Sequence, residues 1–496
     1  MKQLNIQDAG FIIQETDKTP MHICGVSIYN QPPLKGNKRA SYEDIIAYIQ
    51  ARIHVAPIMQ QKLKCVPGDW DRPYWIKDKD FSLHQHINHI ALPSPGDRKQ
   101  FYKLCSDIMS RPLNLKKPLW ELWIVEGLDD IEGLNKNSFA LITKIHHACV
   151  DGTSGGQLVQ MVNDMQPEAE PWPADESVDE IDDRIPGHFE MRANAFANNV
   201  ITALQQTSSV AKRLPQLTRV AKDLVKGDRK AGAGLSVPTT RFNRTPSENR
   251  IFYATTFDLE WLKAIRKNVI EGATINDVMV TIVAGGLRKY LDSKGELPEL
   301  PMAAMLPKNL RDAGDTAKDG NAVGGLLVNI QTDIEDEVER LAAVHERTTE
   351  AKDFSEHADT DSIFPNLMGG FLYPRNGKRL VRAQQRFKLM DRLGAVGLNT
   401  IITNVPGPSF PLYHMGARME SFAGVPPLID GVGIAHAIYS YCGNVQLSAM
   451  SCNDMMPDPE NYEAFLHESY QNLIKALPKD VIEATEAEII LRKENT

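Results

Sequence analysis

Residues 139–152 read FALITKIHHACVDG, an apolar run that ends in two histidines and an Asp-Gly pair. The apolar part has the composition of a strand, and the Gly and Ser residues at 153–156 indicate that a helix begins directly afterwards. A histidine at the end of a strand is held by a rigid scaffold, and its near-neutral pKa lets it take a proton from a hydroxyl. We therefore expect chemistry here, with one histidine as general base and with Asp151 and Gly152 supporting the turn.

Two other uses of paired histidines are metal binding and the activation of a nucleophile. Zinc would require a third ligand in a spacing such as His-Glu-x-x-His, and Cys149 is the only nearby thiol. A nucleophile beside His147 would carry its own signature, and we expect neither a G-x-S-x-G elbow nor a cysteine motif. Direct base catalysis, without a metal and without a covalent intermediate, is the simpler interpretation.

The length and charge of the chain limit its class. With 496 residues it is too long for one ordinary core, so two domains and a connection are expected. Its net charge of -9 argues against broad nucleic-acid binding, because phosphate recognition requires a basic surface. Six scattered cysteines without a C-x-x-C pair predict reduced thiols and a cytoplasmic protein. We recognise no secretory signal or membrane-spanning run, so contact with the plasma membrane or with lipid inclusions is expected to be peripheral.

Strand-like runs alternate with helical patterns in both halves of the chain, which predicts an α/β fold. In the first half, Ser41 and Asp44 form a capping-box pattern before a helix that we expect to end near residue 53. In the second half, Asp258 caps one predicted helix, and Thr274 with Asp277 begins another. The other predicted elements are strands at Trp120–Glu126, Phe139–Ile145, Arg250–Phe257, Leu398–Asn404 and Val445–Ser451 and a final helix near Glu460–Leu477.

A change in composition marks the end of the first domain. Residues 163–183 are rich in proline and acidic residues, as is typical of an exposed linker. We predict an N-terminal domain at 1–175, a linker with connecting helices at 176–245 and a C-terminal domain at 246–496. Within the connection, residues 212–230 interleave Lys and Arg with Leu and Val. They fit either a helix on an anionic membrane surface or a helix packed across the two domains, and Pro215 interrupts the pattern.

With these motifs placed, the chain resembles the bacterial wax ester synthase/acyl-CoA:diacylglycerol acyltransferase family nearly from end to end. The HHxxxDG motif alone is less specific, because it is similar to that of peptide-synthetase condensation domains and of the chloramphenicol acetyltransferase-like superfamily. The ordered set of motifs carries the resemblance: Pro20-Met21-His22, Pro118-Leu119-Trp120, His146–Gly152, Asn276-Asp277, Leu306-Pro307 with Arg311, Gly320-Asn321, and Asn404-Val405-Pro406-Gly407-Pro408.

The resemblance implies two chloramphenicol acetyltransferase-like domains, each a mixed sheet with helices, that enclose a central substrate channel. It implies that a long-chain acyl-CoA enters from one side and a fatty alcohol or diacylglycerol from the other. His147 would deprotonate the hydroxyl, which attacks the thioester directly to give a wax ester or triacylglycerol for lipid storage. No metal or redox cofactor is implied. A condensation-type enzyme with a carrier-bound donor and a non-catalytic lipid-binding scaffold are the alternatives.

The resemblance also suggests roles for residues around the base. His146 would support His147 by packing or hydrogen bonding, and Asp151 would fix the loop, with Arg311 as a candidate ion partner. Asn276 lies in the first turn of its predicted helix, where it is either an oxyanion contact or an exposed residue beside the cap formed by Asp277.

Four more residue groups are assigned structural roles or none. Trp120 of Pro118-Leu119-Trp120 is expected to pack in the core, because large aromatic side chains dominate cores. Pro406 and Gly407 are expected to shape the turn after a strand, and Asn404 to organise its backbone. The histidines at 84, 86 and 89 have a poor ligand spacing and are expected to face solvent.

Overall fold

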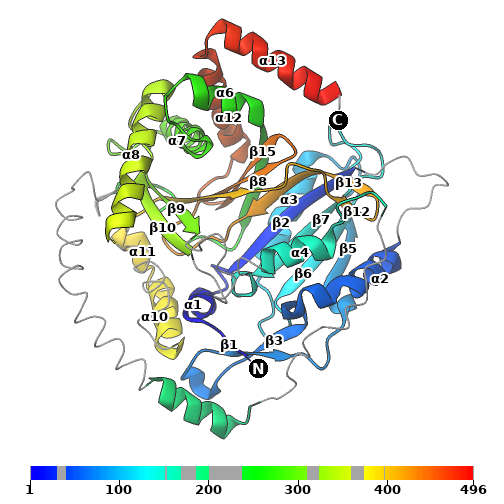
Figure 1. The fold of residues 1–496 in the computed structure, drawn as a ribbon. Coiled ribbons are helices and arrows are strands. Elements are labelled where there is room, and N and C mark those ends of the chain that lie inside the picture. The colour runs from blue at the N-terminus through cyan, green and yellow to red at the C-terminus, as the bar shows by residue number, and fades with distance from the viewer. Residues whose placement is uncertain are drawn as a thin grey trace.

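The computed structural model describes residues 2–30, 41–150, 154–168, 186–199, 237–309, 323–358, 374–395 and 397–494. Asp151, Gly152, Arg311 and the basic segment 212–230 lie outside the described residues. Two six-stranded sheets form the centre of the fold, one above the other in Figure 1. The mixed α/β fold with two sheet-containing halves is as predicted from the sequence.

The first sheet has the strand order β12-β13-β2-β7-β6-β5. Its central pair is antiparallel, with His22 opposite His146 and Tyr29 opposite Phe139. The strands are β2 (His22–Asn30), β5 (Ile87–Ala91), β6 (Trp120–Glu126), β7 (Phe139–His146), β12 (Tyr413–His414) and β13 (Ala417–Val425). Because directly opposed residues of an antiparallel pair share a face, this register places the side chains of His22 and His146 on the same side of the sheet.

Two strands of this first sheet come from the far end of the chain. β13 pairs antiparallel with β2, from Asn30 opposite Arg418 to Cys24 opposite Val425. The two halves of the chain are therefore joined by a hydrogen-bonded ladder, whose register shifts once between Met419 and Ser421. The domain limits at 1–175, 176–245 and 246–496 stay a prediction. The structure shows in addition that β13, from the predicted C-terminal domain, belongs to the sheet of the predicted N-terminal domain.

The second sheet has the order β10-β9-β11-β14-β15-β8 and is mixed, because β11 runs parallel to both of its neighbours. Its strands are β8 (Arg250–Asp258), β9 (Ala303–Asn309), β10 (Val323–Asn329), β11 (Thr400–Pro406), β14 (Ala435–Tyr441) and β15 (Asn444–Cys452). A small third sheet has the order β1-β4-β3, with β1 (Lys2–Gln3), β3 (Gln61–Lys64) and β4 (Tyr74–Lys77).

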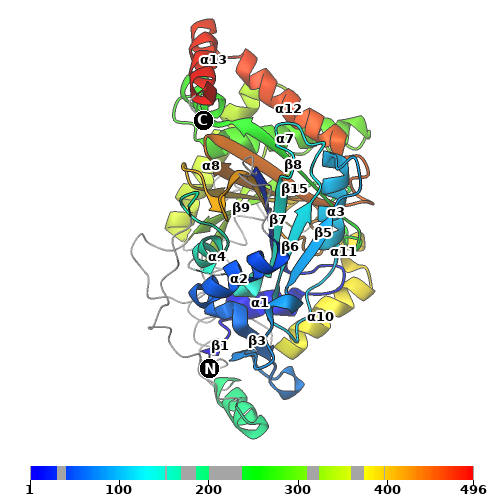
Figure 2. The same ribbon diagram turned by 90° about the vertical axis from the view of Figure 1, so that its right-hand side faces the viewer.

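Helices pack around the two large sheets (Figure 2). The first-half helices are α1 (Ile6–Gln14), α2 (Tyr42–Arg52), α3 (Arg98–Ser110) and α4 (Ser154–Val162). The second-half helices are α6 (Leu259–Asn268), α7 (Ile275–Ser293), α8 (Glu337–Ala358), α10 (Pro374–Arg386), α11 (Leu389–Leu393), α12 (Pro459–Lys475) and α13 (Lys479–Glu494). Among the described helices, none is long and apolar enough to cross a lipid bilayer.

Helix α3 also connects the two halves. The Tyr102 hydroxyl and the Arg98 guanidinium both donate to the carbonyl of Ala254 in β8, at 2.7 and 2.6 Å. Arg98 also pairs with Glu463 of α12 at 2.7 Å. Between the sheets, buried residues of both halves, including Phe101 and Phe252, form one apolar cluster. Burial of this surface favours a fixed orientation of the two sheets.

Local sequence signals fixed several helix starts correctly. The capping boxes predicted at Ser41 and Thr274 are confirmed, and the Asp258 side chain accepts a hydrogen bond at the start of α6. Two predictions were wrong. Helix α13 follows the helix that we expected to be the last. His86 does not face solvent: it is buried and stacks on Trp120, because its ring nitrogen Nδ1 donates to the Trp120 carbonyl at 2.8 Å.

Candidate active site

Two backbone hydrogen bonds fix the histidine pair where β7 ends. The His146 amide donates to the carbonyl of Leu119 at 2.9 Å, and the His147 amide donates to the carbonyl of Met21 at 2.8 Å. Three of the motifs, Pro20-Met21-His22, Pro118-Leu119-Trp120 and the histidine pair, therefore meet at one point. The chain then leaves the sheet through a short 3-10 turn at His147–Cys149.

His146 is held at both of its ring nitrogens. Nδ1 accepts the Ala148 amide at 3.0 Å, so this nitrogen carries no proton. The proton of the neutral ring is therefore on Nε2, which donates to Glu15 Oε2 at 2.5 Å. Both side chains are almost completely buried. Hydrogen bonds thus occupy both ring nitrogens of His146, and its supporting role beside His147 stays a prediction.

The environment of His147 keeps its imidazole neutral. Its ring stacks on Phe11 of α1, with 3.9 Å between the ring centroids and 13° between the planes. Burial lowers the pKa of His147 to about 4, and the nearby His146 acts in the same direction. At neutral pH the ring is therefore in the form that can accept a proton. The residue as a whole, backbone included, is only partly buried.

The segment after the histidines corrects one expectation. Residues 152–156 read GTSGG and so carry the letters of the G-x-S-x-G motif that we had expected to be absent. In an elbow the serine occupies a sharp turn directly after a strand, whereas Ser154 is the first residue of α4, eight residues beyond the end of β7. Ser154 therefore does not occupy the position of an elbow serine.

Trp120 packs in the core beneath the site, as predicted. Its indole nitrogen donates to the carbonyl of Met59 at 2.8 Å, and its ring stacks on His86 with 4.7 Å between centroids. Pro118 and Leu119 are buried beside it. This packing fixes the carbonyl of Leu119, which in turn accepts the His146 amide.

Asn276 and Asn404 form a second group of predicted residues. Asn404 Nδ2 donates to Asn276 Oδ1 at 3.2 Å, which joins the end of β11 to the first turn of α7. Asp277 is fully buried and accepts hydrogen bonds from the Thr274 amide at 2.9 Å and from the Thr348 hydroxyl at 2.7 Å. Its other contact is His345 Nδ1 at 3.0 Å. Asp277 thus ties α7 to α8, and Asn276 is only partly buried.

Gly407 follows β11 at a point where the backbone passes very close to β14. A Cβ at this position would lie 2.2 Å from the Ser440 carbonyl oxygen and 2.3 Å from the Tyr439 ring. The Gly407 amide donates to the Ser440 hydroxyl at 3.2 Å. The preceding Pro406 is the last residue of β11, so the predicted strand extends two residues beyond Asn404.

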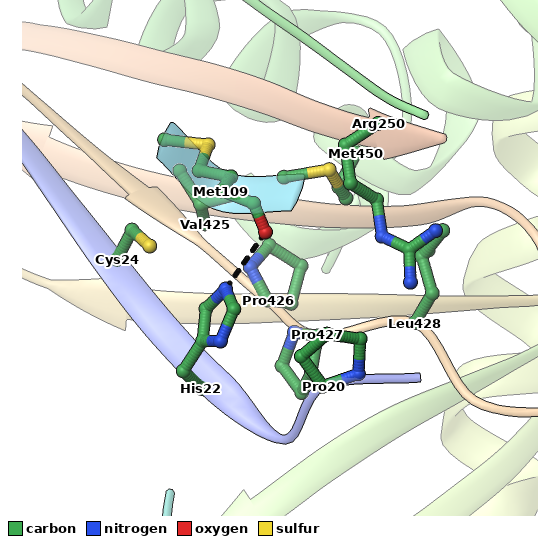
Figure 3. Close-up of a pocket in the computed structure, with 10 residues that line it drawn as sticks. All are labelled: Pro20, His22, Cys24, Met109, Arg250, Val425, Pro426, Pro427, Leu428 and Met450. Carbon is green, nitrogen blue, oxygen red and sulfur yellow. Dashed lines mark hydrogen bonds between the residues drawn. The ribbon is translucent and has the colours of Figure 1, made fainter. Parts of the chain in front are cut away.

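A small pocket lies beside the site, between the two sheets (Figure 3). Both halves of the chain line it: Pro20, His22, Cys24, Met109, Arg250, Val425, Pro426, Pro427, Leu428 and Met450. His22, opposite His146 in the sheet, donates from Nε2 to the Met109 carbonyl at 2.9 Å. Arg250 is buried and donates to the carbonyls of Lys18 and Ser247, and burial lowers its pKa to about 10. The wall is otherwise apolar.

Comparison with known proteins identifies the class. Residues 4–279 match the wax ester synthase/diacylglycerol acyltransferase catalytic domain, and residues 319–474 match the C-terminal domain of the same enzymes. A solved wax ester synthase/diacylglycerol acyltransferase from Marinobacter aquaeolei is similar over 95% of this chain and 98% of that chain, with a TM-score of 0.65 and 24% identity. A starter condensation domain of rhizomide synthetase shares the fold at a TM-score of 0.52. Both share the chloramphenicol acetyltransferase-like fold.

Curated relatives agree with this class. An O-acyltransferase of Acinetobacter baylyi is 28% identical over 95% of this chain and 96% of its own length. A putative diacylglycerol O-acyltransferase of Mycobacterium tuberculosis is 28% identical over 92% of this chain and 87% of its own length. The chain belongs to the wax ester synthase/diacylglycerol acyltransferase family, and it is an O-acyltransferase.

Two residues of the site were missed in the sequence. Phe11 and Glu15 lie one helical turn apart on α1 and its C-terminal cap, and they contact His147 and His146 respectively. Their spacing shows only that they share a helix face. Nothing local indicates that this face contacts a strand end more than 130 residues later.

The contact between Glu15 and His146 predicts a loss of stability on truncation. Glu15→Ala should lower the free energy of unfolding by about 1–3 kcal/mol, because the buried His146 donor loses its acceptor. Glu15→Gln retains an acceptor oxygen and should lose much less. Urea unfolding of the two variants measures the difference. Equal stability of Glu15→Ala and the unchanged chain would contradict the pairing.

The close approach at Gly407 predicts a second loss. Gly407→Ala should be less stable by about 1–3 kcal/mol, because the added methyl forces β11 and β14 apart. Gly187→Ala is the matched control, since a Cβ there meets no atom within 4 Å. Thermal unfolding should separate the two variants. Similar melting temperatures of the two variants would show that the backbone after β11 can shift to accommodate the methyl group without a loss of stability.

Proposed function

We propose that this chain transfers a long-chain acyl group from acyl-CoA to the hydroxyl of a fatty alcohol or a diacylglycerol. The observation that carries the proposal is the pairing of a neutral, partly accessible His147 with a His146 whose two nitrogens are both occupied. Only one ring of the motif is left to act as a base. Family membership supports the acyl-transfer chemistry, and the names of the relatives support the two acceptor classes.

In the proposed mechanism His147 Nε2 takes the hydroxyl proton, because Nδ1 is enclosed by protein. The oxygen forms a bond to the thioester carbon, and the resulting tetrahedral intermediate breaks the C–S bond. The CoA thiolate then takes the proton from the imidazolium. A ring whose pKa is about 4 releases that proton readily, which favours product formation. The reaction requires no metal or redox cofactor and no acyl-enzyme.

The supporting residues keep their proposed roles. Asn276 would donate to the oxyanion: its Oδ1 is occupied by Asn404, so its amide NH₂ is the group available for donation. Asp151 would fix the loop after the histidines, with Arg311 as its candidate partner. We also propose that the chain reaches its apolar substrates by peripheral contact with a membrane or a lipid inclusion.

The direct assay incubates the purified chain with palmitoyl-CoA and either hexadecanol or diacylglycerol. CoA release and the lipid product are followed together. Ester formation with both readouts supports the proposal. Activity only with a carrier-bound acyl donor would instead favour the condensation-type enzyme, and binding of lipid without turnover would favour the scaffold.

Replacement of the base should nearly abolish turnover. His147→Ala is expected to lower kcat by roughly 10² to 10⁴-fold, the usual contribution of general-base catalysis. His84→Ala, at an exposed histidine, is the control and should be unaffected. Ser154→Ala tests the covalent alternative and should retain most activity. Turnover near the unchanged level in folded His147→Ala, or its loss in Ser154→Ala, would refute direct base catalysis.

The lowered pKa of His147 predicts where the acidic limb of the pH profile falls. The base is lost only when the ring is protonated, and burial shifts that event from the ordinary value of 6.5 to about 4. The rate measured as kcat/KM should therefore stay level as pH falls through 6.5 and should decline near pH 4 to 5. A decline centred at pH 6.5 would show that the ring of the free enzyme is solvated.

A further inference from the structure

Helix α10 carries a stripe of exposed cations on its outer face. Its sequence from Pro374 to Arg386 is PRNGKRLVRAQQR. Arg379, Arg382 and Arg386 recur at spacings of three and four residues, which aligns them along one side of a helix, and all three are exposed. Lys388 and Arg392 continue the exposed charge into α11. Among the described residues, none of these five forms an ion pair with a carboxylate.

Apolar side chains are exposed directly beside this stripe. Leu380 is 55% exposed and Phe387 is 62% exposed, and their spacing of seven residues puts them on one line next to the arginines. Leu389 and Leu393 of α11 are exposed as well. Large apolar residues grouped at a surface mark an interaction site when they are bordered by polar groups. We call the exposed residues Arg379, Leu380, Arg382, Arg386, Phe387, Lys388, Leu389, Arg392 and Leu393 the α10–α11 face.

The inner side of α10 is packed, so the helix is held with this face outward. Pro374, Gly377 and Gln385 are buried. Gln385 Nε2 donates to the Thr19 hydroxyl at 3.1 Å, and Lys378 pairs with Asp69 at 3.0 Å. Figure 1 shows α10 and α11, in yellow, on the outside of the molecule, with α10 next to α1. The outward face is therefore a surface of the folded chain.

The charge of this segment is opposite to that of the whole chain. Residues 374–393 contain seven Lys or Arg and one Asp, whereas the chain carries a net charge of -9. Such a local excess complements a surface with many negative charges. A lipid surface also accepts leucine and phenylalanine side chains at the level of its headgroups, as an interfacial amphipathic helix requires.

We propose that the α10–α11 face docks the enzyme on an anionic lipid surface, with the arginines against the headgroups and Leu380 and Phe387 inserted among the acyl chains. The inference deepens the proposed function, which requires access to apolar substrates but does not say where the chain meets them. Docking here has a structural consequence. Helix α10 packs on α1, and α1 carries Phe11 against His147, so the contact lies one helix away from the base.

The test measures binding of the full chain to vesicles, without substrate. Vesicles of phosphatidylcholine alone are compared with vesicles that also contain phosphatidylglycerol, at low and high salt. The charge variant is Arg379→Gln/Arg382→Gln/Arg386→Gln, and the matched control is Lys263→Gln/Arg266→Gln/Lys267→Gln on the exposed side of α6. A third variant, Leu380→Ser/Phe387→Ser, removes the apolar part. Sedimentation with the vesicles gives the partition of each chain.

We expect the unchanged chain to bind the phosphatidylglycerol vesicles and to be released by salt. Three cations near an anionic surface strengthen vesicle binding by on the order of 100-fold. The charge variant should therefore bind more weakly by this factor, and the α6 control should bind like the unchanged chain. The apolar variant should bind more weakly and still respond to salt. The binding assay contains no acyl donor, so it does not depend on catalysis. A chain that binds vesicles here but forms no ester in the palmitoyl-CoA assay would contradict the proposed function and leave the docking surface intact.

Several outcomes would overturn the docking surface. These are equal binding by the charge variant and the unchanged chain, equal losses in the charge variant and the α6 control, or full binding by the apolar variant. A loss confined to a Lys222→Gln/Lys226→Gln/Arg229→Gln/Lys230→Gln variant would assign the contact to segment 212–230 instead. Self-association without vesicles that the charge variant abolishes would make the face a contact between copies of the chain.

Discussion

The antiparallel register of β2 and β7 is the constraint on which the site depends. It sets His22 opposite His146 and continues without a break to Tyr29 opposite Phe139. A slip of one residue would move every side chain of β7 to the other face. His146 would then leave Glu15, and the buried Lys144, which donates to the carbonyls of Ile108 and Arg111 at the end of α3, would lose both acceptors. One ladder thus positions both His146 and the helix that bridges the two sheets.

Local chemistry explains why much of this fold can be predicted from the sequence. The caps at Ser41, Asp258 and Thr274 work through side chains two or three residues from the amides that they satisfy, so the signal is contained in a short window. The same holds for β6 and β7, whose apolar runs lie next to polar turns. The partner of β2 on its other side could not be predicted, because β13 lies almost 400 residues later and strand pairing carries no local mark.

The candidate site likewise contains residues that local sequence reveals and residues that only the folded chain reveals. The histidine pair and Pro118-Leu119-Trp120 are recognisable because their residue types are unusual for a strand end or a core, and the structure brings them together. Phe11 and Glu15 are ordinary helix residues, and only the folded chain shows that one stacks on His147 and the other binds His146. The prediction that His86 faces solvent failed for a related reason. It rested on the spacing of the neighbouring histidines, which does not indicate that the indole ring of Trp120 stacks on His86 in the folded chain.

The crossing of β13 into the first sheet has a consequence for how the protein acquires its structure during synthesis. Until residue 425 has left the ribosome, β2 has a partner only on the side of β7, and its other backbone edge is free to pair with any extended segment. The first sheet is thus completed only after nearly nine tenths of the chain has been made. Pairing over such a sequence separation is slow and leaves the nascent chain open to aggregation through this edge.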